Sequence, residues 1–253
     1  MKINWLKKIA FQGAHSAFTD LCEFNQGLFC CFRQATNHVS EDGHISIIKL
    51  NLTGQQLSTD KISLPCTDLR DPKLSVTPDG RLMLIAFARE FSPQGTLQVS
   101  KNYCWFSQDG NSWSSPHRFA EDNWWLWRIR WHQQQAYGFA YNREMNSINF
   151  YAGHPLRSFH LIKRQALSLA EHGKGYPNES DLQFYANQCV AIVRRDADSY
   201  SAQLGHSVFP FTRWRWTDLG FYLGGPVMQL LNEQVALVAG RVVSDGKLKT
   251  AVF

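Results

Sequence analysis

The sequence predicts an all-β fold, a five-bladed β-propeller formed by one domain over residues 1–253. Two observations lead to this prediction. One pattern, a β-prone run, a turn and an apolar run that ends on arginine, occurs five times, and its clearest copy is LRDPKLSVTPDGRLMLIAFAR at 69–89. The copies recur roughly every fifty residues, a period typical of propeller blades. Their anchors are Asp20, Asp71, Ile129, Glu179 and Gly225.

Composition agrees with a sheet-rich globular protein and excludes several classes. The chain has nine Trp and seventeen Phe, which suit aromatic packing between blades, and a net charge of +5 without any block of Lys and Arg. We therefore expect no nucleic-acid partner. No stretch reaches the roughly 18 apolar residues of a membrane-spanning helix, so we expect no membrane partner. Six cysteines show no zinc spacing, which favours buried free thiols in a reducing cytoplasm.

The N-terminal run from Ile3 to Phe11 has no local pairing partner. The last blade ends with residues 248–253 and is one strand short, so we expect the N-terminal strand to pair with it and close the propeller. Lys7 and Lys8 interrupt what would be the apolar part of a signal peptide. We therefore expect a cytoplasmic location.

Blade one, predicted from about His15 to Leu64, contains a polar loop after its first hairpin, QATNHVSEDGH at 34–44, that carries His38 and Asp42. Two interpretations stay open for it: a surface turn, or a loop that offers an acid to a substrate. Blade two contains SQDGNSW at 107–113, which matches the Asp-box pattern S-x-D-G-x-x-W. Ser107 and Asp109 can hydrogen bond to the turn backbone, and Gly110 allows positive φ, so we expect a structural role.

The Asp box, the Asp71–Pro72 pair and the series from Asn178 to Arg194 resemble the sialidase (neuraminidase) superfamily, including sialidase-like proteins described as glycosyl hydrolases. In that family an arginine triad holds the substrate carboxylate, a loop aspartate is the acid/base, and a tyrosine paired with a glutamate is the nucleophile. The resemblance places Glu179 at the glutamate partner, Arg194 at a triad arginine and Arg33 just before the acid loop. It also makes Asp71 a substrate-contacting aspartate.

The chain departs from the sialidase pattern at several points. Thr19 follows Phe18 where the family has an F-R-I-P phrase, and the acid position falls near His38 and Val39. We count five blades rather than six, and no tyrosine matches the nucleophile before Phe253. We therefore expect a glycosidase-like hydrolase rather than a true exo-sialidase, with Tyr141 as the one displaced tyrosine to consider.

Glu179, Asp71 and Asp20 are predicted at equivalent strand ends of three blades, where they would converge on one mouth of a central channel. Glycoside hydrolysis needs one protonated carboxyl group and one ionised carboxylate. We assign Glu179 as general acid and Asp71 or Asp20 as base or nucleophile. The groups predicted to bind an anionic or polyhydroxylated sugar are Arg33, Arg89, Arg128, Arg194 and His38.

Salt bridges to neighbouring blades are the competing interpretation for each of these acids. Arg128 and Arg130 alternate with Trp127 and Trp131, so they suit either a ligand site or packing between blades. The predicted function is therefore a glycoside hydrolase acting in the channel; the alternative is a non-catalytic carbohydrate-binding or scaffold propeller. We expect no cofactor and no metal site. Which sugar, linkage and stereochemical outcome apply, and whether the chain oligomerises, does not follow from the sequence.

Overall fold

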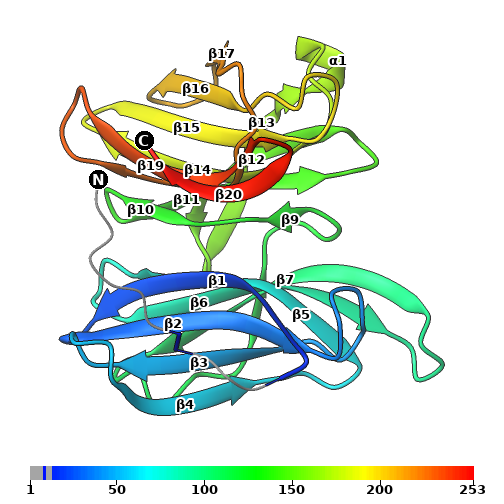
Figure 1. The fold of residues 1–253 in the computed structure, drawn as a ribbon, viewed down its shortest axis with the longest axis vertical. Helices are drawn as coiled ribbons and strands as arrows, with labels where there is room; N and C mark the ends of the chain where they lie inside the picture. Colours follow the sequence, from blue (N-terminus) through cyan, green and yellow to red (C-terminus); the bar gives the residue numbers. More distant parts are fainter. Residues whose placement is uncertain (1–7, 10–12) are drawn as a thin grey trace. The chain divides into compact units, whose positions relative to one another are not determined.

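A computed structural model describes residues 8–9 and 13–253, and within them the chain forms twenty strands and one short helix. The strands build five antiparallel sheets that follow one another along the sequence, as Figure 1 shows. The predicted all-β five-bladed propeller fold is confirmed. The chain divides into two compact units, Met1–Trp125 and Leu126–Phe253. The prediction of one domain over 1–253 stays a prediction.

The first unit holds two four-stranded sheets. The first consists of β1 (His15–Phe24), β2 (Gly27–Ala35), β3 (His44–Leu50) and β4 (Gln56–Ile62), and the second of β5 (Thr67–Val76), β6 (Leu82–Phe91), β7 (Leu97–Ser107) and β8 (His117–Phe119). Strands β2 and β6 are buried along most of their length, whereas β4 alternates between exposed and shielded residues. The core between the sheets contains Phe29, Ile47, Leu69, Leu84 and Trp105.

The second unit holds three sheets. The first contains β10 (Arg130–His132), β11 (Gln135–Asn142), β12 (Ser147–His154) and β13 (Ser158–Ser168). The short β9 (Trp125–Leu126) also pairs with β11, although Trp125 itself is the last residue of the first unit. Helix α1 (Leu169–His172) follows. The next sheet is β14 (Pro177–Tyr185), β15 (Gln188–Arg195), β16 (Gln203–Val208) and β17 (Trp214–Asp218), and the last is β18 (Gly224–Leu230), β19 (Ala236–Ser244) and β20 (Lys247–Val252).

The first strand of four sheets contains a β-bulge, in which two residues face one residue of the second strand, and the third sheet has a matching two-residue excess between β9 and β10. Four of the bulges are register shifts in β1, β5, β14 and β18. In the third sheet the Trp127 N–H donates to the Phe139 carbonyl and Arg130 pairs with Tyr137, which leaves two residues opposite Gly138. The bulged pairs are Phe18–Thr19, Asp71–Pro72, Arg128–Ile129, Asn178–Glu179 and Gly225–Pro226. The bulge is thus the structural repeat behind the sequence period.

The register corrects one prediction. Asp71 is the first residue of its bulge, Glu179 is the second residue of its bulge, and Asp20 directly follows its bulge. The three acids therefore occupy three different positions of the repeat rather than equivalent ones. A bulge adds one residue to one strand only, and a pattern of apolar residues along the sequence does not show where it is added.

The turn at Ser107–Trp113 has the local structure predicted for it. Asp109 Oδ1 accepts hydrogen bonds from the N–H groups of Asn111 and Ser112, both at 2.9 Å, and Ser107 Oγ accepts one from the Gly110 N–H at 2.8 Å. Gly110 has φ +74°, and a Cβ atom there would lie 2.3 Å from Cζ of Phe29. The turn is therefore fixed by both backbone conformation and packing. Its assignment as an Asp box stays a prediction.

Other predictions meet the structure only in part. The N-terminal strand predicted at 3–11 lies outside the described residues, except for Lys8 and Ile9, and Ile9 packs against Cys30 and Phe32 of the first sheet. All six cysteines are free thiols, but Cys66 is exposed, contrary to the expectation that all are buried. No helix in the part of the chain that the structure describes is long and apolar enough to span a membrane.

Candidate functional site

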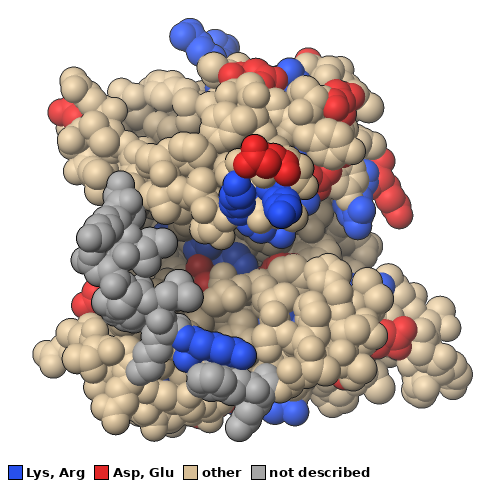
Figure 2. Space-filling model, viewed as in Figure 1, with Lys and Arg blue, Asp and Glu red and all other residues tan. Residues whose placement is uncertain are grey.

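Ionisable side chains, several of them buried, form a cluster in each unit. We define the Asp68 cluster as Arg33, Asp68, Arg70 and Arg89 in the first unit. The Glu179 cluster comprises Glu179, Arg194, Asp196, Tyr222 and Arg241 in the second unit. Figure 2 shows that basic and acidic side chains are interspersed over the face in view, without one dominant charged block.

Glu179 reaches its partners because of the bulge in β14. The bulged pair lies opposite Arg194 of β15, and Arg194 Nη1 is 2.7 Å from Glu179 Oε1. The other oxygen, Oε2, accepts a hydrogen bond from the Gly225 N–H at 2.6 Å and lies 3.5 Å from Arg241 Nη2 of the next sheet. All these partners are donors, and an ionised carboxylate only accepts. The contacts suit Glu179 as an acceptor rather than as the general acid predicted above.

Arg194 lies between two carboxylates. Besides its contact with Glu179, its Nε donates to Asp196 Oδ1 at 2.9 Å and its Nη2 is 2.9 Å from Asp196 Oδ2. Burial alone would lower the pKa of Arg194, but the charges of Glu179 and Asp196 raise it above its ordinary value. The Arg194 guanidinium thus stays charged and brings the carboxylates of Glu179 and Asp196 close together.

Tyr222 completes this cluster. The Arg194 guanidinium lies over the Tyr222 ring, with 5.4 Å from Cζ to the ring centroid. Burial raises the pKa of Tyr222, so its hydroxyl keeps its proton at neutral pH. A Cβ on Gly224 would lie 2.5 Å from the Tyr222 hydroxyl, so the glycine makes room for this side chain. Gly224 therefore serves close packing around Tyr222.

Asp181, two residues after Glu179, has a different environment. It is fully buried, and its oxygens accept hydrogen bonds from Arg130 Nε at 2.8 Å and Arg130 Nη2 at 2.6 Å. The Met228 N–H donates to it at 2.9 Å, and Arg128 Nε lies 3.7 Å away. Asp181 thus links the three sheets of the second unit. Arg128, predicted to bind a sugar, is directed to this buried carboxylate.

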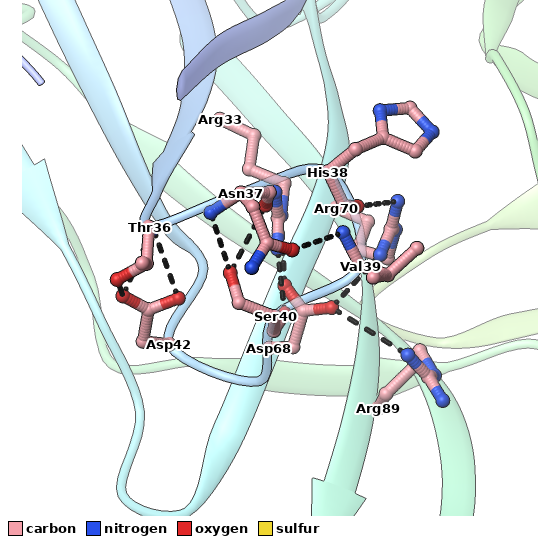
Figure 3. Close-up of polar contacts among 10 residues, drawn as sticks. All are labelled: Arg33, Thr36, Asn37, His38, Val39, Ser40, Asp42, Asp68, Arg70 and Arg89. Carbon is pink, nitrogen blue, oxygen red and sulfur yellow. Dashed lines mark hydrogen bonds and ion pairs between the residues drawn. The ribbon is translucent and has the colours of Figure 1, made fainter. Parts of the chain in front are cut away.

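The Asp68 cluster is drawn in Figure 3. Asp68 is fully buried; its Oδ1 accepts from Arg33 Nε at 2.8 Å and its Oδ2 from Arg70 Nη1 at 3.1 Å, with Arg89 Nη1 3.9 Å from Oδ2. Arg33 also donates to the carbonyls of Asn37 at 3.0 Å and Ser40 at 2.7 Å. Arg33, predicted to bind a sugar, therefore anchors the loop after β2.

The remaining predicted residues of the first unit, Asp20, Asp71 and His38, each have different contacts. Asp20 accepts a hydrogen bond from the Leu74 N–H of β5 at 2.9 Å, which joins the two sheets. Asp71 is buried with φ +48°, beside Lys73, whose Nζ donates to the Asp71 carbonyl at 3.4 Å. The His38 ring packs on His15 and Phe18, each at 5.3 Å between ring centroids.

Asp42, considered above as a substrate acid, is held by its own loop. Hydrogen bonds from Ser40 and Thr36 lower the pKa of Asp42 well below its usual range, so the group is ionised at neutral pH. This favours the surface-turn interpretation of the loop.

Tyr141 is buried, with its ring 6.5 Å from that of Trp127.

The sequence did not reveal Asp68 and Arg70 as a pair, and it gave no sign of Asp196 or Tyr222 as site residues. Asp68 and Arg70 are two apart in a strand, which places them on one face and was a usable signal. Tyr222 and Asp196 lie in connections, where no periodicity points to them. Within the described residues, no group of three or more His, Cys, Asp or Glu side chains could hold a metal ion.

The fold and these clusters define a five-bladed propeller with arginine–carboxylate clusters on its blades. No family model matches the chain, and no curated protein matches its sequence. Among solved structures it is similar to a protein of unknown function from Dyadobacter fermentans, with TM-score 0.77 and 16% identity over 94% of this chain and 83% of that one.

Glycoside-acting enzymes share the fold. An α-L-arabinanase from Penicillium chrysogenum complexed with arabinobiose aligns with TM-score 0.70 and 11% identity, over 96% of this chain and 80% of that one. A point mutant of the NanB sialidase from Streptococcus pneumoniae aligns with TM-score 0.67 and 7% identity, over 94% of this chain and 60% of that one. At these identities the likeness establishes the fold alone.

Proposed function

We propose that the chain is a glycoside hydrolase that acts on an anionic or polyhydroxylated sugar, with its site at the Glu179 cluster. One observation carries the proposal: a single guanidinium, that of Arg194, holds two carboxylates beside a protonated tyrosine hydroxyl. Carboxylate pairs are what glycoside hydrolysis requires. The fold shared with an arabinanase and a sialidase supports the same reaction class by analogy.

Three side chains of the cluster have a proposed role. Glu179 serves as base or nucleophile, because every partner of its oxygens is a donor. Tyr222 keeps its proton and can donate it toward the leaving oxygen. Arg241 is 47% exposed and bound only loosely to Glu179, so it is the cation most available to a substrate.

The experiment is a screen of chromogenic glycosides, including arabinosides, xylosides, galactosides, uronides and sialosides. Glu179→Gln and Tyr222→Phe should each lower turnover at least about a hundredfold, the usual contribution of one acid or base. Glu90→Gln is the matched control, because Glu90 is also a part-buried glutamate, paired with Lys101 and Tyr103 in the first unit. Asp71→Asn is measured beside them, because Asp71 lies in the equivalent bulge of another blade. Unchanged turnover in Glu179→Gln would contradict the assignment.

A second function, non-catalytic carbohydrate binding, is favoured by one specific observation. Asp68, Glu179 and Asp181 are all tied to arginines, which is the arrangement expected when buried acids serve structure. Sugar binding on a glycan array without turnover of any glycoside, and with binding weakened by Arg241→Gln, would support this function over hydrolysis.

A further inference from the structure

The Asp68 cluster has more positive than negative charge. One carboxylate serves three guanidiniums, so the cluster carries a formal excess of two positive charges. Asp68 Oδ1 is used by Arg33, and Oδ2 is shared between Arg70 at 3.1 Å and Arg89 at 3.9 Å. Burying unbalanced charge is costly unless a counter-charge is close.

The three arginines differ in how well they are satisfied. Arg33 uses all its nitrogens on Asp68, Asn37 and Ser40. Arg70 is 92% buried and donates from Nη1 to Asp68 and from Nη2 to the His38 carbonyl, but its Nε has no hydrogen-bond partner in the described chain. Arg89 has 28% of its side chain exposed and, within the same residues, makes the 3.9 Å ion pair and no hydrogen bond.

Neighbouring acids do not balance the excess. In Figure 3 Asp42 points toward Thr36 and away from the guanidiniums, and its oxygens accept from Thr36 N at 3.0 Å and Thr36 Oγ1 at 2.6 Å. Glu90 pairs with Lys101 and Tyr103. Glu41 is exposed on the loop near Gly95.

The bulge that follows Arg70 adds one charge of each sign. Asp71 is negative, and Lys73, whose Nζ donates to the Asp71 and Pro72 carbonyls, is positive. The formal excess of two positive charges among Arg33, Asp68, Arg70 and Arg89 is therefore unchanged by this pair.

Aromatic rings hold the Arg70 guanidinium in place. Its Cζ lies 5.4 Å from the Phe18 ring centroid and 5.9 Å from that of Trp125. Trp125 in turn stacks on Phe87 at 4.1 Å with an interplanar angle of 11°. Rings around a guanidinium exclude water, which strengthens its attraction for an anion.

We propose that Arg89 and Arg70 bind an oxyanion, a carboxylate, sulfate or phosphate group, beside Asp68. Arg89 is the accessible cation that meets the anion first. Arg70 supplies a fixed guanidinium whose Nε–H has no hydrogen-bond partner in the described chain. Guanidinium groups match the geometry of such oxyanions. The proposal concerns the first unit alone and does not depend on the Glu179 cluster.

The test is isothermal titration of the whole chain with sodium phosphate, sodium sulfate and sodium acetate, with sodium chloride keeping the ionic strength constant. We expect saturable binding to the wild type and about ten-fold weaker binding to Arg89→Gln, the loss expected for one charge-assisted hydrogen bond. Arg81→Gln is the matched control: Arg81 has 26% of its side chain exposed and pairs with Asp79 at the other end of β6. Its affinity should equal that of the wild type.

Arg70→Lys, checked for folding by circular dichroism, keeps the charge but removes the fixed guanidinium, so it should also bind more weakly. Tighter phosphate and sulfate binding would assign a tetrahedral ligand group, and tighter acetate binding a carboxylate. Equal affinity in wild type and Arg89→Gln, or no saturable binding of any of the three anions, would overturn the proposal.

Discussion

Asp68 offers the sharpest test of how the first unit is held together. The substitution Asp68→Asn keeps the shape of the side chain and removes its charge. Arg33 is fully buried and Arg70 nearly so, and both depend on this carboxylate at 2.8 and 3.1 Å. In the variant, the new amide must turn its NH₂ group toward one of the two guanidiniums, which places donor against donor.

The size of the effect follows from this burial. Removing one partner of a buried ion pair costs about 3 to 5 kcal/mol, because the remaining charge is left without compensation. With a urea m-value of about 3 kcal/mol/M, the unfolding midpoint should fall by about 1 to 1.7 M. Urea unfolding followed by tryptophan fluorescence measures it, since Trp105 and Trp125 both lie in this unit.

A matched control separates burial from pairing. Asp79 forms an equally close ion pair with Arg81, at 2.7 Å, but 56% of its side chain is exposed. Asp79→Asn should therefore cost less than about 1 kcal/mol. If Asp68→Asn also costs less than about 1 kcal/mol, the Asp68 cluster does not stabilise the fold and the reasoning fails.

Two further predictions concern the turn at Ser107–Trp113. Gly110→Ala should destabilise the fold by about 1 to 3 kcal/mol more than Gly80→Ala in urea unfolding, because both glycines have positive φ but only the Cβ at 110 meets a ring, that of Phe29; equal losses would refute the packing argument. Hydrogen bonds from the Ser112 and Asn111 N–H groups lower the pKa of Asp109 to about 2. The stability that Asp109 contributes is therefore present above pH 4 and lost as the pH falls toward 2. Asp109→Asn should reduce the dependence of the thermal unfolding midpoint on pH between pH 4 and 2. The same dependence in the variant as in the wild type would contradict this.

Local signals predicted much of the fold. Alternating apolar residues, turn residues such as Asp79–Gly80 and the repeat of the whole pattern indicated five blades, and the structure confirms five sheets. The turn residues Ser107, Asp109 and Gly110 also bond as predicted. These features depend on residues close together in the chain, which is why they could be deduced from it.

The candidate site was predicted less well. Glu179 and Arg194 were predicted separately as site residues, and they are in contact at 2.7 Å. Arg33 and Arg128 were expected to face a ligand, but each is directed toward a buried carboxylate, Asp68 or Asp181. The equivalence of Asp20, Asp71 and Glu179 was wrong because each has a different position relative to its bulge.

The sequence by itself determined the kind of secondary structure, the number of blades and which segments carry charge. Only the tertiary structure decided which charges meet: Arg241 and the Gly225 N–H reach Glu179 from another sheet, and Asp68 gathers three arginines from three strands. The physical reason is range. Strand and turn preferences act between near neighbours in the chain, whereas ion pairing depends on register and bulges that only the assembled sheets fix.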